Sequence, residues 1–363
     1  MTLKAVVMAG GKGTRLRPIT YSIPKPLVPI AGKPCINYIL GSYYEAGIRD
    51  TIITAGYKFE SLINGVLNYK NSDQNILFSV EKEPAGTAGS IKMISKFIDD
   101  TFVVGSGDTL LDFNVREIID RHRKSKAKIT IALTEVDDPS QFGIVELKDG
   151  IIQRFLEKPT KEEAFSNLIN AGLYVMEPEI LDMIPSSEPY DFAKQLFPKL
   201  LAEGVKIHGF NATGTWLDTG RPNDMIKANQ LMTEKYGTPH SSEMMSGKII
   251  MASPSSSASM AKIIGPTYIG KSVKFSDSSK IDSSALYDNV EIGEGVVIMD
   301  SILMDDVKIG KNSRIVKSVI MKGTSIGQNC EIHESVIAPK LSLQSNSRVY
   351  NVSLSSEIIE EER

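Results

Sequence analysis

The pattern of apolar and polar positions in residues 1–231 predicts strands that alternate with helices. Short apolar runs predict strands at Leu3–Ala9, Thr51–Ala55, Ile76–Val80, Thr101–Val104 and Lys128–Leu133. Helix-like stretches lie near Pro34–Ala46, Lys58–Tyr69, Gly89–Ile98 and Asn114–Lys124. This order is typical of an α/β fold, with a mostly parallel sheet covered by helices on both faces. A hairpin is inserted where Asp149-Gly150 separates Gly143–Leu147 from Ile151–Leu156.

From Ser284 onward the chain repeats a 17-residue unit four times without a gap. An Ile-Gly pair recurs at Ile292-Gly293, Ile309-Gly310 and Ile326-Gly327, and the fourth copy has Leu343-Gln344 there. Aliphatic residues every five or six positions can point into a prism whose turns fall at the glycines and polar residues. The repeat therefore predicts a parallel β-helix with about three short strands per coil.

Composition divides the chain into four parts. Residues 1–231 form the α/β domain, and residues 232–262 include the serine-rich stretch Ser253–Ser259, which is typical of a connection between domains. Residues 263–355 form the repeat domain. The charged residues 356–363 predict a frayed tail.

Charge and cysteine content exclude several classes of function. A net charge of −3 over 363 residues argues against a broad nucleic-acid-binding face. The four histidines show no metal-binding spacing, and Cys35 and Cys330 lie too far apart to suggest a disulfide framework. No apolar run is long enough to cross a bilayer, so we expect a cytoplasmic protein without a membrane partner.

The most informative stretch follows the first strand. It runs Gly10-Gly11-Lys12-Gly13-Thr14-Arg15-Leu16-Arg17-Pro18, and Pro24-Lys25-Pro26-Leu27 comes soon after. Glycines let a backbone approach a phosphate closely, and Arg15 and Lys25 add positive charge. The spacing fits neither the Walker pattern nor the dinucleotide pattern, which needs a glycine where Leu16 stands. The stretch therefore predicts a different polyphosphate site.

This stretch resembles the signature of the sugar-phosphate nucleotidyltransferases, also called nucleotide-sugar pyrophosphorylases, some of which carry C-terminal hexapeptide repeats. The resemblance implies a Rossmann-like domain followed by a left-handed β-helix. It also implies an enzyme that makes an NDP-sugar and pyrophosphate from a nucleoside triphosphate and a sugar 1-phosphate. Homo-oligomers are expected, since the ends and faces of such a solenoid are rich in aliphatic residues.

The resemblance also implies roles for the residues of the glycine loop and of a second loop. Arg15 would hold the leaving pyrophosphate, and Lys25 would contact the phosphate undergoing transfer. The residues expected to bind the nucleotide are Gly10, Gly11, Gly13, Thr14, Glu81, Gly86 and Thr87.

Two carboxylates match the metal-binding positions of the family. Asp108 follows the strand Thr101–Val104, and a carboxylate at the carboxyl end of a strand is well placed to hold Mg²⁺. Asp108 is therefore expected to act in catalysis and, with Asp218, to bind the metal. Asp112 is expected to cap the following helix instead.

A third group of residues resembles the sugar pocket of the family. Glu157-Lys158-Pro159 stands between the Gly143 and Asn170 segments, and Trp216 precedes Asp218. Glu157 would accept hydrogen bonds from sugar hydroxyls, and Lys158 would hold the sugar phosphate. Gly143, Asn170 and Trp216 would contact the same substrate.

The base and the sugar stay open at this point. The loop Glu83-Pro84-Ala85-Gly86-Thr87-Ala88-Gly89 resembles the mannose-1-phosphate guanylyltransferase branch, and a carboxylate at Glu81 can accept from both N1–H and N2–H₂ of guanine. GTP and mannose 1-phosphate are thus favoured over a glucose-1-phosphate thymidylyl- or uridylyltransferase.

Two further alternatives belong to other classes. Related architectures occur in catalytically silent regulatory subunits, but these usually lose signature residues that are present here. A bifunctional enzyme with an acyltransferase in the repeats would need a catalytic histidine. His333 is the histidine of the repeats, and it stands inside a regular repeat with no long loop that could build an acyl-CoA site, which argues against this alternative.

Overall fold

The computed structural model describes residues 3–186, 188–254 and 260–354. The chain splits into two compact units, and the division between them does not fall at the boundary predicted at residue 231. The first unit comprises Met1–Lys12 and Pro34–Asp218, and the second comprises Gly13–Lys33 and Thr219–Arg363. The segment from Gly13 to Lys33, which holds most of the signature, is therefore part of the same compact unit as the C-terminal repeats.

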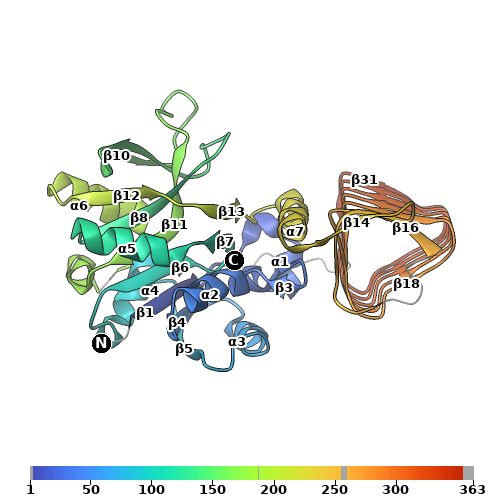
Figure 1. Ribbon diagram of the computed structural model, residues 1–363, viewed down its shortest axis with the longest axis horizontal. Helices are drawn as coiled ribbons and strands as arrows, with labels where there is room; N and C mark the ends of the chain where they lie inside the picture. The colour runs from blue at the N-terminus through green and yellow to red at the C-terminus, as the bar shows by residue number, and fades with distance from the viewer. Residues whose placement is uncertain (1–2, 187, 255–259, 355–363) are drawn as a thin grey trace. The chain divides into compact units, whose positions relative to one another are not determined.

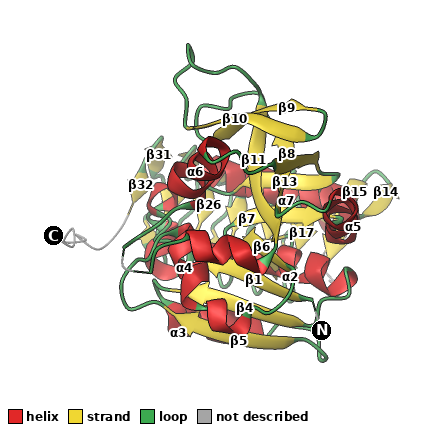
Figure 2. Ribbon diagram, turned by 90° about the vertical axis from the view of Figure 1, so that its left-hand side faces the viewer, coloured by secondary structure: helices red, strands yellow, loops and turns green. Residues whose placement is uncertain are grey.

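The first unit is built on a nine-stranded sheet with the order β5-β4-β1-β6-β11-β8-β12-β10-β9 (Figure 2). The five strands expected from the apolar runs are present as β1 (Lys4–Ala9), β4 (Asp50–Ala55), β5 (Asn75–Val80), β6 (Phe102–Ser106) and β8 (Ile129–Glu135). β5, β4, β1 and β6 are all parallel. This confirms the predicted α/β class and places the carboxyl ends of four strands at one edge.

The other half of the sheet is mixed. β11 (Leu168–Met176) runs antiparallel between β6 and β8, and β12 (Ile207–Asn211) runs parallel to β8. β9 (Gly143–Lys148) and β10 (Ile151–Glu157) form the predicted hairpin. The apolar pattern does not predict β11, whose ladder with β8 shifts register between Asn170 and Tyr174.

Helices cover both faces of this sheet, as expected. They are α2 (Ile36–Glu45), α3 (Phe59–Leu67), α4 (Thr87–Met93), α5 (Val115–Ser125) and α6 (Phe197–Ala202). Residues of α4 and α6 share one core cluster with Val6 and Val104. On the opposite face, a Cβ added to Gly105 would clash with Ile39 of α2. Adjacent residues of β6 thus face different helices, which is the period-two pattern of a buried strand.

One expected helix cap is wrong. Asp112 lies inside β7 (Thr109–Phe113), which pairs with β13 (Gly214–Asp218). The helix α5 is capped instead by Asn114, whose side chain accepts a hydrogen bond of 3.2 Å from the Glu117 N–H. The residue that caps the helix is therefore two positions later than expected, and Asp112 belongs to the preceding strand.

The second unit begins with short elements of the signature segment. These are the 3₁₀ turns Thr14–Leu16 and Lys25–Leu27, α1 (Ile19–Ser22), and β2 (Pro29–Ile30), which pairs with β3 (Lys33–Pro34). Helix α7 (Pro222–Tyr236) contacts β2 as well as three strands of the repeat region, β15, β17 and β20. Within the described residues, no helix has the length and apolar character needed to cross a membrane.

Much of the stretch predicted as a connection, residues 232–262, is regular structure. It holds the end of α7, β14 (Thr238–Ser241) and β15 (Met245–Met251), and β15 pairs with two strands of the β-helix. The residues of β15 are therefore ordered by hydrogen bonds to the backbone of the first coil. The serine-rich residues 255–259 and the predicted tail 356–363 lie outside the described residues.

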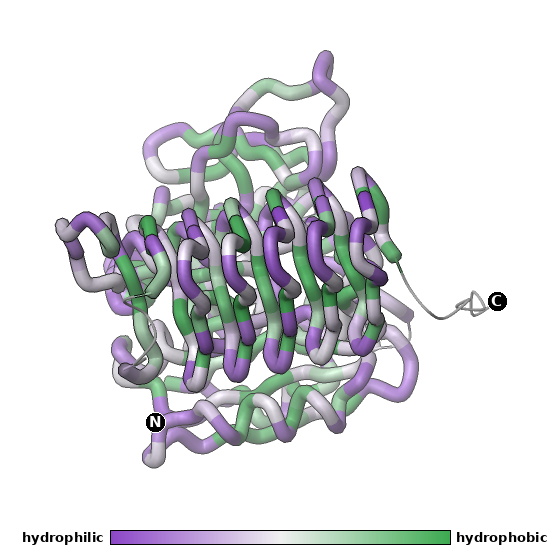
Figure 3. The backbone as a smooth tube through the Cα atoms, turned by 90° about the vertical axis from the view of Figure 1, so that its right-hand side faces the viewer, coloured by the Kyte–Doolittle hydropathy of each residue, from purple (hydrophilic) through white to green (hydrophobic). Residues whose placement is uncertain are grey.

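The repeats form a parallel β-helix, left-handed as the resemblance implied (Figures 1 and 3). Strands stack on their equivalents 17 residues later, as Ile281, Ile298 and Ile315 show by lying in register. The strands are β16 (Ala261–Ile264), β17 (Thr267–Ile269), β18 (Lys274–Phe275), β19 (Ser279–Asp282), β20 (Ala285–Leu286), β21 (Glu291–Ile292), β22 (Val297–Met299), β23 (Ile302–Leu303), β24 (Lys308–Ile309), β25 (Arg314–Val316), β26 (Val319–Ile320), β27 (Ser325–Ile326), β28 (Glu331–His333), β29 (Val336–Ile337), β30 (Ser342–Leu343), β31 (Arg348–Tyr350) and β32 (Ser353–Leu354).

The corners of the β-helix are left-handed residues at the same 17-residue spacing. One series is Ser278, Gly295, Asn312, Asn329 and Asn346, another is Ser283, Asp300, Lys317, Glu334 and Asn351, and a third is Ser272, Asn289, Asp306, Gly323 and Lys340. The glycines of the Ile-Gly pairs do not form these corners, contrary to expectation. A Cβ on Gly310 would lie 2.6 Å from the Gly327 carbonyl carbon, so these glycines allow close approach of successive coils.

Candidate active site

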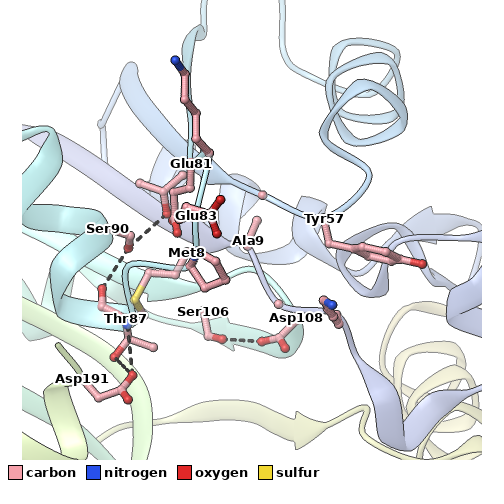
Figure 4. Close-up of a pocket in the computed structure, with 18 residues that line it drawn as sticks. Met8, Ala9, Tyr57, Glu81, Glu83, Thr87, Ser90, Ser106, Asp108 and Asp191 are labelled. Atoms are coloured by element: carbon pink, nitrogen blue, oxygen red, sulfur yellow. Dashed lines mark hydrogen bonds between the residues drawn. The ribbon is translucent and has the colours of Figure 1, made fainter. Parts of the chain in front are cut away.

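A cavity of about 540 Å³ opens beyond the carboxyl ends of the parallel strands (Figure 4). Residues that follow β1, β4, β5 and β6 contribute to its wall, as the topology of the sheet requires. Six of the predicted site residues line it, namely Gly10, Gly11, Glu81, Gly86, Thr87 and Asp108. Its size is in the range of small-molecule sites.

The glycine loop and Glu81 face each other in this cavity. A Cβ added to Gly10 would lie 3.4 Å from Oε1 of Glu81. The other carboxylate oxygen of Glu81 accepts a hydrogen bond of 3.2 Å from the Ala85 N–H. Burial raises the pKa of Glu81, and that hydrogen bond partly opposes the rise. Because glycine stands at position 10, that residue has no side chain to lie against this carboxylate oxygen.

The loop that follows Glu81 is held by a residue that sequence reasoning missed. The N–H and the hydroxyl of Thr87 both donate to Oδ1 of Asp191, at 3.1 and 3.0 Å. Gly86 has φ of 76°, and a Cβ there would lie 2.7 Å from the Tyr190 carbonyl oxygen. Asp191 also lines the cavity. It stands 104 residues from Thr87, so no local pattern points to it.

The two predicted metal ligands come together through the β7–β13 ladder. Asp218, the last residue of β13, pairs with Thr109, and Asp108 directly precedes Thr109. The hydroxyl of Ser106 donates a hydrogen bond of 2.6 Å to Oδ1 of Asp108 (Figure 4). The cavity wall includes both Ser106 and Asp108.

This pair fits a hard divalent cation. Such an ion is commonly held by one or two carboxylates together with substrate phosphates and water. Among the described residues there is no cluster of three or more acidic, histidine or cysteine side chains suited to a metal. Asp108 and Asp218 thus suit an ion that completes its coordination with the phosphates of the nucleotide. The role of both residues stays a prediction.

The predicted sugar-pocket residues also form one cluster. Gly143 pairs with Glu157 across the β9–β10 hairpin, and a Cβ on Gly143 would lie 2.8 Å from the Glu157 carboxylate. Trp216 Nε1 donates to the Ala171 carbonyl at 2.9 Å, and the indole meets the Phe142 ring edge-on at 5.2 Å. The cluster therefore joins β9, β10, β11 and β13.

Asn170 and Lys158 have defined orientations in this cluster. The side-chain oxygen Oδ1 of Asn170 accepts from the Gly172 N–H at 2.9 Å, and its side-chain nitrogen Nδ2 donates to the Tyr174 hydroxyl at 3.0 Å. Lys158 has a left-handed backbone with φ of 50°. Its N–H bonds the Phe142 carbonyl at 3.0 Å. These bonds turn the chain after Glu157 and hold the Glu-Lys pair in place.

Burial sets the electrostatics of Glu157. It raises the pKa of this carboxyl, while the charges of Lys158 and Lys194 act in the opposite direction and Asp191 adds to the rise. Asp191 thus affects Glu157 electrostatically as well as holding Thr87. A half-buried carboxyl with nearby cations is suited to accept hydrogen bonds from hydroxyl groups.

The remaining signature residues lie in the second unit and are described within it. Gly13 has φ of 62°, its carbonyl accepts from the Thr20 hydroxyl at 3.0 Å, and a Cβ there would lie 3.0 Å from Cβ of Lys25. Lys25 is only 5% exposed. Thr14 and Arg15 are exposed on the turn Thr14–Leu16.

Asn229 of α7 fastens the signature segment to the second unit. Its side-chain oxygen accepts from the Ala31 N–H and from the Tyr287 hydroxyl, both at 2.8 Å. Its amide donates to the carbonyls of Pro29, at 3.2 Å, and Met225, at 2.9 Å. Sequence reasoning missed this residue, because a single asparagine in a helix carries no signal of such a role.

Comparison with known proteins matches both parts of the chain. The model of the family described as "Nucleotidyl transferase" matches residues 4–235, and that of the "GMPPB C-terminal domain" matches residues 263–361. Mannose-1-phosphate guanyltransferase 2 of Candida glabrata is 35% identical over 257 residues, which cover 69% of this chain and 70% of that protein. Mannose-1-phosphate guanylyltransferase of Mycobacterium tuberculosis is 32% identical over 302 residues, with 81% and 82% covered.

A solved structure agrees with these matches. HddC from Yersinia pseudotuberculosis, complexed with GMP-PN, superposes with a TM-score of 0.55 at 28% identity. The match covers 64% of this chain and 100% of that one. The glycine loop beyond β1, the carboxylates on the β7–β13 ladder and the family model over residues 4–235 agree, and the chain belongs to the nucleotidyl transferase family.

Proposed function

We propose that this protein transfers the guanylyl group of GTP to mannose 1-phosphate, giving GDP-mannose and pyrophosphate. The observation that supports the proposal is the pairing of Asp218 with Thr109, the residue that follows Asp108, together with the position of Asp108 in the wall of the cavity of the glycine loop. The names of the relatives supply the substrates, because both act on mannose 1-phosphate by name.

The reaction joins two anions. An oxygen of the sugar phosphate forms a bond to the α-phosphorus of the nucleotide, and the bond from that phosphorus to pyrophosphate breaks. Each close pair of like charges costs roughly 4 kcal/mol at about 4 Å and an effective dielectric constant of about 20. The attacking phosphate is already ionised at neutral pH, so the chemistry needs offsetting positive charge and no side-chain nucleophile.

Asp108 and Asp218 would hold Mg²⁺, which supplies positive charge to the phosphate oxygens when it is bound. Ser106 orients the Asp108 carboxylate through its hydrogen bond. The backbone of Gly10 and Gly11 lines the same cavity and suits a triphosphate. For Arg15 and Lys25 we keep the roles expected from the signature, contacts to the leaving pyrophosphate and to the transferred phosphate.

Glu81 favours guanine as the base. Its carboxylate lies in the cavity, and only one of its oxygens has the Ala85 N–H as a donor. Guanine presents two adjacent donors, N1–H and N2–H₂, whereas thymine presents N3–H alone. The similar structure complexed with GMP-PN supports the same choice.

Glu157, Asn170 and Lys158 would select the sugar phosphate. The half-buried carboxyl of Glu157 would accept hydrogen bonds from hydroxyls, Asn170 is oriented by its two hydrogen bonds, and Lys158 would bring a charge to the phosphate. Gly143 leaves room beside Glu157, and Trp216 packs against Phe142 at the edge of the cluster.

We also propose that the protein is cytoplasmic, which its two buried free cysteines favour, and that it forms a homo-oligomer.

The reverse reaction tests this proposal. Incubation of the full chain with GDP-mannose, pyrophosphate and Mg²⁺ should give GTP and mannose 1-phosphate in equal amounts, detected by chromatography. Replacement of GDP-mannose by dTDP-glucose or UDP-glucose should give much less nucleotide. Faster breakdown of either of these would favour a glucose-1-phosphate enzyme, and no breakdown of any of the three by folded protein would favour a silent regulatory subunit.

A further inference from the structure

Tyr190 holds the nucleotide loop through its backbone. The Tyr190 N–H donates to the Ala85 carbonyl at 2.9 Å. The Tyr190 carbonyl accepts from the N–H groups of Ala88, at 2.8 Å, and Gly89, at 2.9 Å. All three bonds join main-chain atoms, so the path of the loop is set by a segment that is distant from it in the sequence.

Thr87 in the same loop is bonded to the two residues that follow Tyr190. Its N–H and its hydroxyl donate to Oδ1 of Asp191, at 3.1 and 3.0 Å (Figure 4). The hydroxyl oxygen also accepts from the Phe192 N–H at 3.0 Å. The single hydrogen of this hydroxyl is thereby directed at Asp191. Thr87 and Asp191 both line the nucleotide cavity, so these bonds help to shape its wall.

Phe192 connects the same segment to the sugar cluster. It begins the π-helix Phe192–Leu196, a rare element that is frequent at functional sites. The centre of its ring lies 5.1 Å from that of Tyr174, and the two residues are 1% and 4% exposed. The Tyr174 hydroxyl accepts from Nδ2 of Asn170 at 3.0 Å. Direct contacts therefore run from Thr87 to Asn170, a predicted sugar contact, through close-packed side chains.

Asp191 also acts on the sugar cluster through its charge. Its second carboxylate oxygen lies 3.9 Å from Nζ of Lys194. Burial is the main cause of the raised pKa of Glu157; Lys158 and Lys194 oppose the rise, and the charge of Asp191 adds to it. Asp191 is thus joined to the nucleotide loop by hydrogen bonds and to the sugar cluster by its charge.

We propose that Asp191 is a positioning residue for both substrates, and that the segment Tyr190–Phe192 makes nucleotide binding and sugar-phosphate binding interdependent. Because the two clusters are taken as the sites of the two substrates, this coupling rests on the proposed function. None of the described residues predicted to bind the sugar lies in the wall of the nucleotide cavity, although both groups belong to the first unit. A nucleotide that orders the loop also orders the sugar cluster, and by linkage the sugar phosphate acts equally on the nucleotide.

Asp191→Ala removes the acceptor of both Thr87 donors and should affect both substrates. We expect the Kd for GTP, measured by calorimetry without acceptor, to rise about tenfold. At saturating GTP, the KM for mannose 1-phosphate should rise about fivefold, with a smaller change in kcat. Asp191→Asn keeps an oxygen for Thr87 and should restore both affinities. Asp182→Ala is the control, because it replaces an exposed aspartate, and it should change none of these constants.

The pH dependence separates this role from a purely structural one. Asp191→Asn removes a charge that raises the pKa of Glu157, while Lys158, Lys194 and Tyr174 remain around that carboxyl. The pKa of Glu157 should therefore fall. At saturating GTP, the decrease of kcat/KM for mannose 1-phosphate at acidic pH should move to a lower pH than in the unsubstituted protein. A residue that only stabilised the fold would leave the position of this decrease unchanged.

Other results would overturn the coupling. Weaker GTP binding in Asp191→Ala with an unchanged KM for mannose 1-phosphate would confine Asp191 to the nucleotide loop. If that variant does not fold, Thr87→Val takes its place, because it removes the hydroxyl between Asp191 and Phe192 and keeps the N–H. It should raise the KM for mannose 1-phosphate, and an unchanged KM would contradict the connection. Absence of pyrophosphate release by the unsubstituted protein would instead refute the proposed function itself.

Discussion

The hydroxyl of Tyr287 donates a hydrogen bond of 2.8 Å to the side-chain oxygen of Asn229. The same oxygen accepts from the Ala31 N–H, so one buried amide joins the first coils of the β-helix, α7 and the signature segment. Asn229 is 3% exposed and both its oxygen and its nitrogen are hydrogen-bonded. The repeats therefore support the segment that carries Arg15 and Lys25.

Removal of the Tyr287 hydroxyl should lower the free energy of unfolding slightly, and replacement of Asn229 should lower it much more. Tyr287→Phe leaves the Ala31 contact in place and should cost about 1 kcal/mol of unfolding free energy. Asn229→Leu also leaves the Ala31 N–H and the Pro29 carbonyl without this partner, and should cost about 2–4 kcal/mol. Denaturant unfolding measures both.

Tyr69→Phe provides the control for this pair, because Tyr69 is 52% exposed. We expect it to unfold like the unsubstituted protein. Equal stability of Tyr287→Phe and Tyr69→Phe would mean that the Tyr287–Asn229 bond does not stabilise the protein.

Asp108→Asn should lower turnover about 100-fold or more, because a neutral amide holds a divalent cation poorly and one strong electrostatic element is lost. The Mg²⁺ concentration needed for half-maximal pyrophosphate release should rise as well. Asp112→Asn, four residues further on and inside β7, is the control and should keep most of the activity. Normal Mg²⁺-dependent turnover in Asp108→Asn would remove Asp108 from the metal site.

Lys158→Ala should affect the acceptor rather than the nucleotide. We expect the KM for mannose 1-phosphate to rise about tenfold through loss of a charge-assisted contact, with little change in the Kd for GTP. Lys161→Ala removes an exposed lysine three positions further on and should change neither constant. Equal losses for both substrates in Lys158→Ala would argue against the sugar-phosphate contact.

Protonation of Glu157 should lower kcat/KM for mannose 1-phosphate at acidic pH. Burial holds the pKa of Glu157 above its ordinary value, so the carboxyl becomes protonated, and loses acceptor capacity, at a higher pH than an ordinary glutamate. At saturating GTP, kcat/KM for mannose 1-phosphate should therefore fall as the pH is lowered through this pKa. Glu157→Gln should have a lower plateau without this limb. An unchanged limb in that variant would assign it to another group, such as Glu81, whose pKa burial also raises.

Local pattern was enough to predict much of the fold. The parallel strands β1, β4, β5 and β6 lie within a few residues of the apolar runs, and the 17-residue period fixes the register of the coils. The corners fall at polar residues, as expected, and at Gly295 and Gly323, but not at the glycines of the Ile-Gly pairs. Glycine is needed at the Ile-Gly pairs because the backbone of the next coil lies too close for a Cβ atom. This contact between coils cannot be seen in the sequence of a single repeat.

Contacts between distant segments account for what the sequence did not predict. Asp191 reaches Thr87 across 104 residues, and Asn229 reaches Ala31 across 198. Composition predicts a connection over residues 232–262, yet β15, which lies within this range, pairs with β16 and β17 of the β-helix. The motif, in contrast, predicts Asp108 and Asp218 as partners, and Asp218 pairs with Thr109, the residue that follows Asp108. Their role at a metal stays a prediction.

Pyrophosphate release with Mg²⁺, measured for GTP, dTTP, UTP, CTP and ATP, each with mannose 1-phosphate and with glucose 1-phosphate, tests the proposed transfer most directly. We predict release that requires both substrates, with the highest kcat/KM for GTP and mannose 1-phosphate. A preference for dTTP or UTP with glucose 1-phosphate would contradict the roles given to Glu81 and Glu157, and no release with any pair would contradict the transfer itself.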